Sequence, residues 1–173
     1  MLLIINIDGG SRGNPGIGAS GVIIKDKDGK VLIKQGLFFT KCTNNQAEYQ
    51  ALRLALVLAG EIGGKDLKIT SDSELLVKQF NGVYKIKNPD LKILMEGIKH
   101  LVKNFKSVTL GHTLREGNSQ ADEICNLTMD AGKKNKFENG HIYTICSDLN
   151  NLGKEKTVKE NIQKAKQLEL FDL

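Results

Sequence analysis

Acidic residues occupy four junctions where a strand is predicted to end or a helix to begin: Asp8, Glu48, Asp72 and Asp122. In a mixed sheet whose first strand is central, two strand ends and two helix N-termini can converge on one patch. Carboxylates gathered there repel one another at neutral pH, and a divalent cation is needed to compensate them. The pattern therefore predicts a divalent-metal site of the kind that cleaves phosphodiester bonds.

Taken singly, three of these acids have a structural alternative as helix caps. Asp72 directly precedes a predicted helix, where an N-cap residue stands. Glu48 follows Asn45 by three residues, which is the spacing of a capping box. Asp122 follows Ser119 at the same spacing, so both interpretations stay open for each of the three.

Asp8 has no such alternative, because it ends an apolar predicted strand at residues 2–8. A charge at that point gains nothing from helix capping and loses hydration if it is buried. It needs a compensating partner, and a cation meets that need.

The remaining pattern predicts the elements that must position the acids. Strands are predicted at residues 2–8, 21–25, 31–38, 67–71 and 108–113, and helices at residues 45–59, 73–80, 91–105 and 119–131. The Gly-rich residues 9–18 are expected to separate the first two strands. The order βββαβααβα predicts an α/β fold, with a five-stranded mixed sheet flanked by helices.

The length and composition favour one core domain with an appendage. Of the 173 residues, 40% are hydrophobic and 26% are charged, which is enough to bury one core. The predicted core elements end near residue 132. Residues 133–173 hold eight lysines and six acids, with a short predicted strand at 141–146. We expect them to form a partly disordered C-terminal extension.

Charge and cysteine content narrow the partners and the compartment. Lys and Arg number 25 against 20 Asp and Glu, which favours a polyanionic partner. The three cysteines are odd in number and far apart, so neither a disulfide framework nor a zinc site is expected, and the expected location is cytoplasmic. Residues 1–7 are expected to form a buried strand rather than a targeting segment, and no segment is expected to span a membrane.

An ordered set of segments resembles the type 1 ribonuclease H family. The segments are IDGGSRGNPGIGASGVI, TNNQAEYQALRLAL, ITSDSELLVKQFNG, YKIKNPDL and GHTLREGNSQADEICNLTMD, and the resemblance covers residues 1–132. The specificity lies in their order rather than in any single motif. The resemblance implies a ribonuclease H-like fold with its catalytic domain at residues 1–132, and a monomer is expected.

The resemblance also implies an activity and a cofactor. Members of the family cleave the RNA strand of RNA/DNA hybrids with two Mg²⁺ ions, for which Mn²⁺ can substitute, and leave 3′-hydroxyl and 5′-phosphate ends. The family's metal ligands match the four acids, the first of them as the bridging ligand: Asp8, Glu48, Asp72 and Asp122. His112, ten residues before Asp122, matches a histidine on a mobile loop, with a role in proton transfer or product release. Without the resemblance, His112 would be taken for a surface residue.

Expected substrate contacts surround Glu48. The amides of Asn44, Asn45 and Gln46 are suited to the 2′-hydroxyl that distinguishes RNA from DNA. The backbone at Gly10 can approach the nucleic acid closely, and Asn14 matches a family position near the hybrid. Lys41 and Thr43 are expected to contact phosphates of the DNA strand. The structural alternatives are that the two asparagines cap a helix and that the glycines form a hairpin turn.

Two departures from the family pattern bear on substrate binding. The segment between the second and third predicted helices, residues 81–90, is short. The basic protrusion with which some members bind the hybrid is therefore expected to be missing. The chain has no tryptophan, so stacking on the substrate would fall to Phe or Tyr. Lys78, Lys85 and Lys87 are candidates for an additional basic surface, with solvated lysines as the structural alternative.

The last seven residues, 167–173, resemble the short peptide by which bacterial replication proteins bind the sliding clamp. The residues that would contact the clamp are one hydrogen-bonding group and three apolar anchors: Gln167, Leu168, Leu170 and Phe171. The alternative is that these apolar side chains fold back on the core.

Two other functions remain open on the same fold. A non-catalytic nucleic-acid-binding module would not need all four acids, and this chain retains them. A transposase or junction resolvase is not expected to combine the amides at residues 44–46 with Glu48. The sequence therefore favours a hybrid-cleaving endonuclease with roles in primer and hybrid removal.

Overall fold

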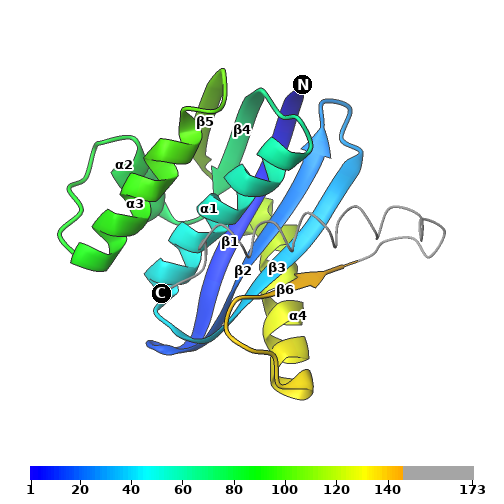
Figure 1. The fold of residues 1–173 in the computed structure, drawn as a ribbon, viewed down its shortest axis with the longest axis vertical. Helices are drawn as coiled ribbons and strands as arrows, with labels where there is room; N and C mark the ends of the chain where they lie inside the picture. Colours follow the sequence, from blue (N-terminus) through cyan, green and yellow to red (C-terminus); the bar gives the residue numbers. More distant parts are fainter. Residues whose placement is uncertain (146–173) are drawn as a thin grey trace.

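The computed structural model describes residues 1–145, which form a six-stranded sheet with helices on both faces (Figure 1). The strands are β1 (Leu2–Gly13), β2 (Gly16–Asp26), β3 (Val31–Cys42), β4 (Asp66–Ser71), β5 (Ser107–His112) and β6 (His141–Thr144). The helices are α1 (Asn44–Glu61), α2 (Glu74–Phe80), α3 (Pro89–Val102) and α4 (Ser119–Asn135), with a 3-10 turn, η1 (Arg115–Asn118), before α4. The predicted α/β class and order of elements are confirmed, and β6 adds a strand to the five expected. Within these residues, no helix is long and apolar enough to cross a membrane.

β1 lies inside the sheet, whose order is β5-β4-β1-β2-β3-β6, and it pairs in parallel with β4. Parallel neighbours cannot be joined by a tight turn, and here β2, β3 and α1 separate them in the chain. Ile7 and Ser71 are register partners at the end of the parallel pair. Asp8 and Asp72, the next residue on each segment, therefore leave this pair side by side.

The Gly-rich residues 9–18 belong mostly to β1 and β2, so the prediction that they form a loop separating the two strands is wrong. β1 runs through them to Gly13 and pairs antiparallel with β2, so Asp8 lies inside β1 opposite Gly21 rather than at a strand end. β4 stops at Ser71, and beyond that point β1 keeps only β2 as a neighbour. Asp8 therefore marks the point where the parallel pairing ends and one edge of β1 opens.

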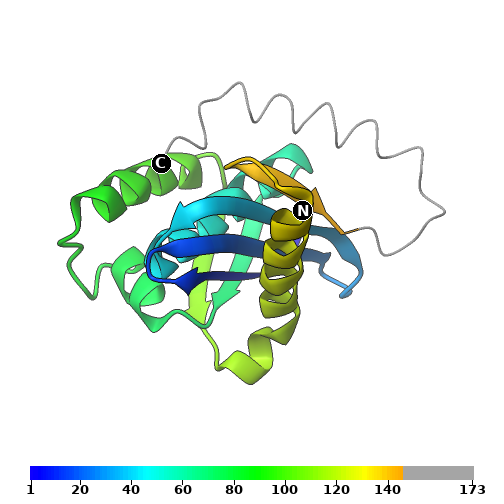
Figure 2. The same ribbon diagram turned by 90° about the horizontal axis from the view of Figure 1, so that it is seen from below.

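The helices divide between the two faces of the sheet (Figures 1 and 2). α1 is buried between the sheet and α3, and its Leu54 joins Ile5 of β1 in the main core cluster. α4 covers the other face, where Cys125 and Met129 pack on Ala19. Each helical layer thus buries one apolar face of the sheet.

Two glycines let the helices approach the sheet closely beside the first acidic residue. A Cβ at Gly9 would overlap the backbone of Ala47 and Glu48 in α1. A Cβ at Gly21 would crowd the carbonyl oxygen of Ala121 in α4. The two helices that carry acids are therefore held in backbone contact with β1 and β2.

The expected extension comprises residues 133–173, and its first part, residues 133–145, contributes to α4 and to the sheet. α4 continues into it, and β6 pairs antiparallel with β3, with His141 opposite Phe38. The Phe137 ring packs edge-on against Phe38 and stacks on His141. The clamp-like peptide at residues 167–173 lies outside the described residues.

Gly9→Ala is expected to destabilise the fold, because the added methyl group would push α1 away from β1. Overpacking of this kind costs about 1–3 kcal/mol, to be measured as the free energy of unfolding in urea. Gly97→Ala in α3 is the matched control, since a Cβ there meets nothing within 4 Å and alanine favours a helix. A Gly9→Ala protein as stable as the wild type would contradict the close contact.

Candidate active site

Three carboxylates from three elements meet at one point. Asp8 of β1, Glu48 of α1 and Asp72 after β4 each offer an oxygen within 4.8 Å of the others. Asp8 is 7% exposed and Glu48 is 5% exposed, so both are buried. Asp122 lies outside this group and is exposed, but it lines the same pocket of about 320 Å³. The structure therefore brings all four predicted acids to one pocket, three of them in close proximity.

The N-terminus of α1 is fixed independently of Glu48. Thr43 is the N-cap and forms a capping box with Gln46. The Gln46 N–H donates to Thr43 Oγ1 (3.2 Å), and the Thr43 N–H donates to Gln46 Oε1 (2.8 Å). Ser20 Oγ of β2 donates to the Ala47 carbonyl (2.6 Å). Glu48 therefore has no capping role and lines the pocket.

The capping alternative is also wrong for the other two acids. The N-cap of α2 is Ser73 rather than Asp72, and its Oγ accepts from the Leu76 N–H (3.3 Å). α4 begins without a side-chain capping bond, and Asp122 lies in its first turn. Helix capping thus leaves these carboxylates available to a ligand.

Hydrogen bonds tie the start of α4 to β1. Asn118 Nδ2 donates to the Ile7 carbonyl (2.8 Å), and Cys125 Sγ donates to the Asp8 carbonyl (3.3 Å). Both contacts are buried and join residues that are far apart in the chain. They hold the first turn of α4, and with it Asp122, beside the other three acids.

Burial and mutual repulsion make the carboxylates costly to ionise. Burial, followed by the charges of Asp72 and Asp122, raises the pKa of Asp8 from 3.8 to about 7. Burial, followed by the charges of Asp8 and Asp72, raises the pKa of Glu48 well above its usual 4.5. The backbone N–H of Gly9 lowers both pKa values in part.

The donor set fits a hard divalent cation. Glu48 Oε2 is buried and has no hydrogen-bond partner among the described residues. An unpaired buried carboxylate oxygen is unfavourable, and a bound cation would satisfy it. The clustered ligand atoms of Asp8, Glu48 and Asp72 are all oxygens, which Mg²⁺ and similar ions prefer.

Arg115 is a pocket residue that the sequence analysis missed. Its Nε lies 3.8 Å from Asp72 Oδ2, and its side chain is 93% exposed. Its charge also lowers the pKa of Glu48 in part. The sequence feature that could have identified it is that Arg115 is the one arginine between His112 and Asp122.

His112 lies outside the pocket formed by the acids. It ends β5, is exposed and is in register with Ser71 of β4. Ser71 directly precedes Asp72, so His112 stands beside the strand end that carries this acid. The structure thus places Arg115 within the pocket and His112 at its side.

Two of the expected substrate contacts, Gly10 and Asn44, line the pocket. The Asn44 N–H donates to Asn14 Oδ1 (3.1 Å), which ties the β1–β2 turn to α1. Lys41 near the end of β3 and Asn45 in the first turn of α1 are exposed. The remaining two expected contacts, Thr43 and Gln46, form the capping box of α1.

The strand order, the helices on both faces and the acidic pocket define a ribonuclease H-like protein. The profile of the family described as reverse transcriptase-like matches residues 6–128. Ribonuclease HI of Halobacterium salinarum is 37% identical over 123 residues, which cover 71% of this chain and 62% of the relative. Ribonuclease H of Ruthia magnifica is 34% identical, and the match covers 74% of this chain and 95% of the relative. The chain belongs to the type 1 ribonuclease H family.

Solved structures show the same fold. RNase H1 from Halobacterium salinarum superposes with a TM-score of 0.73 at 35% identity, covering 75% of this chain and 98% of that chain. LC11-RNase H1, solved in complex with an RNA/DNA hybrid, superposes with a TM-score of 0.72 at 38% identity, covering 76% and 99%. This chain spans 62% of the Halobacterium relative and 36% of three mycobacterial relatives.

Asp8→Asn is expected to stabilise the metal-free protein at neutral pH. At pH 4 the carboxyl is protonated in the folded state and roughly half protonated in the unfolded state, so its effect on stability is below about 1 kcal/mol. As the pH rises towards 7 the unfolded state ionises first, and the wild type loses on the order of 3 kcal/mol. In EDTA at pH 8 the variant should therefore melt roughly 5–10 °C higher than the wild type.

At pH 4 the two proteins should melt at similar temperatures, and Mg²⁺ at pH 8 should narrow the gap by stabilising the wild type. Asp28→Asn, at an exposed turn position, is the matched control and should leave the melting temperature unchanged. Equal melting temperatures of the wild type and Asp8→Asn in EDTA at pH 8 would show that the fold does not raise the pKa of Asp8.

Proposed function

We propose that this chain is a ribonuclease H that hydrolyses the RNA strand of RNA/DNA hybrids and leaves 3′-hydroxyl and 5′-phosphate ends. The observation that carries the proposal is the cluster of Asp8, Glu48 and Asp72 oxygens within 4.8 Å, with the buried Glu48 Oε2 unpaired. Family membership and a relative solved with a bound hybrid support the choice of substrate. Its roles would be the removal of primers and stray hybrids.

We further infer that the site holds two Mg²⁺ ions, for which Mn²⁺ can substitute. Asp8, Glu48 and Asp72 would supply the clustered ligands, and Asp122 would complete the set from the rim of the pocket. Ions bound there would activate the attacking water and stabilise the leaving 3′ oxygen. Burial of Asp8 and Glu48 keeps their charges unscreened by water, which strengthens their interaction with a cation.

Residues around the acids would position the substrate and move a proton. Arg115 is exposed and 3.8 Å from Asp72, so its guanidinium can reach a phosphate held next to the carboxylates. His112, on the Asp72 side of the pocket, would transfer a proton to the leaving group or assist product release.

Discrimination between RNA and DNA would depend on the amides at the start of α1. Asn44 in the pocket and the exposed Asn45 would bond the 2′-hydroxyl of the RNA strand. Gln46 would join them through its Nε2 donor, because its Oε1 is engaged in the capping box. The rest of the hybrid, including the DNA-strand phosphates, would contact Gly10, Asn14, Lys41 and Thr43.

With Mg²⁺, the wild type should cut a labelled RNA/DNA hybrid and leave RNA duplex, DNA duplex and single-stranded RNA intact. Asp8→Asn removes a metal ligand and should lower kcat/KM by about a thousandfold or more. Asp28→Asn, which removes an exposed charge of the same kind, should retain wild-type activity. Hybrid binding without cleavage in either Mg²⁺ or Mn²⁺ would contradict the enzyme and favour a binding module.

We propose that residues 133–173 extend the catalytic domain at residues 1–132 and carry a peptide that binds a bacterial sliding clamp. Support comes from the sequence of the last seven residues, which lie outside the part of the chain that the structure describes. The contacting residues would be Gln167, Leu168, Leu170 and Phe171. The protein would act as a monomer in the cytoplasm.

The full-length protein should bind an immobilised bacterial sliding clamp in biolayer interferometry. Leu170→Ala/Phe171→Ala removes two apolar anchors and should lower the affinity at least about tenfold. Val158→Ala/Ile162→Ala truncates two apolar side chains outside the peptide and should bind as the wild type does. Equal affinity of all three proteins, or no binding by the wild type, would rule out the clamp peptide.

A further inference from the structure

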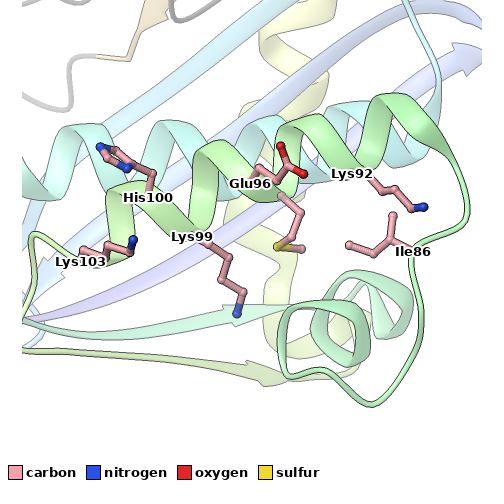
Figure 3. Close-up of a pocket in the computed structure, with 7 residues that line it drawn as sticks. Ile86, Lys92, Glu96, Lys99, His100 and Lys103 are labelled. Atoms are coloured by element: carbon pink, nitrogen blue, oxygen red, sulfur yellow. The ribbon is translucent and has the colours of Figure 1, made fainter.

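A groove lies along the side of α3 that faces the end of α2 (Figure 3). None of its lining residues belongs to the acidic pocket. Its volume is about 400 Å³, and it is lined by Ile86, Lys92, Met95, Glu96, Lys99, His100 and Lys103. Figure 3 shows Lys92 beside Ile86 at one end of the helix, and His100 and Lys103 at the other. We call this feature the α3 groove.

The α3 groove carries positive charge that the fold does not neutralise. Three lysines against one glutamate leave a net charge of +2, with the histidine counted as neutral. Within residues 1–145, neither Lys92 nor Lys103 forms an ion pair, and Glu96 forms none either. A row of like charges without partners raises the local potential and attracts anions.

The three lysines share one face of the helix. Lys92, Lys99 and Lys103 are separated by seven and four residues, which places their side chains above one another along α3. Eleven residues of helix extend about 16 Å, over which one strand of a duplex presents roughly five phosphates. The row therefore matches the backbone of a nucleic acid in both charge and length.

The α3 groove is joined to the helix that begins at the active site. Lys99 Nζ donates to the Phe80 carbonyl at the end of α2 (2.6 Å) and lies 3.9 Å from the centroid of the Phe80 ring. α2 begins at Glu74, two residues after Asp72, and its seven residues extend about 10 Å. Lys99, in the middle of the row, therefore lies within roughly 20 Å of Asp72. A duplex longer than the segment being cut can reach it.

We propose that the α3 groove binds the sugar–phosphate backbone of the hybrid duplex beyond the cleavage site. This inference rests on the proposed function, because it assigns one substrate to both sites. Lys92 and Lys103 contact phosphates, while Lys99 holds the wall of the groove against α2. Such contacts are independent of sequence and weaken with salt, because binding releases counterions.

The test uses fluorescein-labelled RNA/DNA hybrids of two lengths. Centred on the carboxylates, 8 base pairs extend about 13 Å to each side and 24 base pairs about 40 Å, so only the longer hybrid reaches along the groove. Binding is measured by fluorescence anisotropy at several salt concentrations, with full-length protein carrying Asp8→Asn to prevent cleavage. Cleavage of both hybrids is measured in parallel with protein that retains Asp8.

Lys92→Gln/Lys103→Gln should weaken binding of the long hybrid roughly 5–20-fold and lower the salt slope of log K by about 1–2. Binding of the short hybrid should change less than about twofold, since that hybrid does not reach along the groove. Lys27→Gln/Lys30→Gln removes the same charge near the β2–β3 turn and should affect neither hybrid. Melting temperatures equal to those of the parent protein show that each variant is folded.

Equal losses on both hybrids, an equal loss in the control, or an unchanged salt slope would overturn the assignment of the α3 groove. The lysines would then serve another acidic partner or face only solvent. Failure of the protein that retains Asp8 to cut either hybrid would overturn the proposed function itself, and this inference with it.

Discussion

Asp8 and Glu48 are buried next to each other, and their carboxylates repel one another when both are ionised. Burial raises the pKa of both carboxyls, and the charge of Asp8 adds to the effect on Glu48. Within residues 1–145, neither acid forms an ion pair with a lysine or an arginine. A fold that keeps two such groups unpaired holds free energy that a bound cation can recover.

The architecture imposes this proximity through the backbone. The parallel register of β1 and β4 places Asp8 beside Asp72, and the missing side chain at Gly9 lets α1 bring Glu48 against β1. The hydrogen bond from Cys125 Sγ to the Asp8 carbonyl holds α4 against the other face of the sheet. Because rigid elements on both faces of the sheet position the acids, a cation would meet a site that is already formed.

The fold class and the acids could be predicted because periodicity and charge are visible locally in the sequence. Residues 9–18 could not, since glycines typical of a loop become strand only through pairing with β2. Thr43 rather than Asn45 caps α1, a shift of the kind that helix boundaries commonly show. The place of Arg115 in the pocket depends on how η1 turns after β5, which no local pattern specifies.

Calorimetric titration of the metal-free protein with Mg²⁺ or Mn²⁺ at pH 7, in buffers of different ionisation enthalpy, would show whether the acidic pocket binds a cation. Because the pKa of Asp8 is raised to about 7 and that of Glu48 is also raised, metal binding should release on the order of one proton. The release should shrink as the pH is raised towards 9, where more of the carboxyl groups are already ionised. Metal binding without proton release at pH 7, or no binding at all, would contradict the claim that these carboxylates form a cation site.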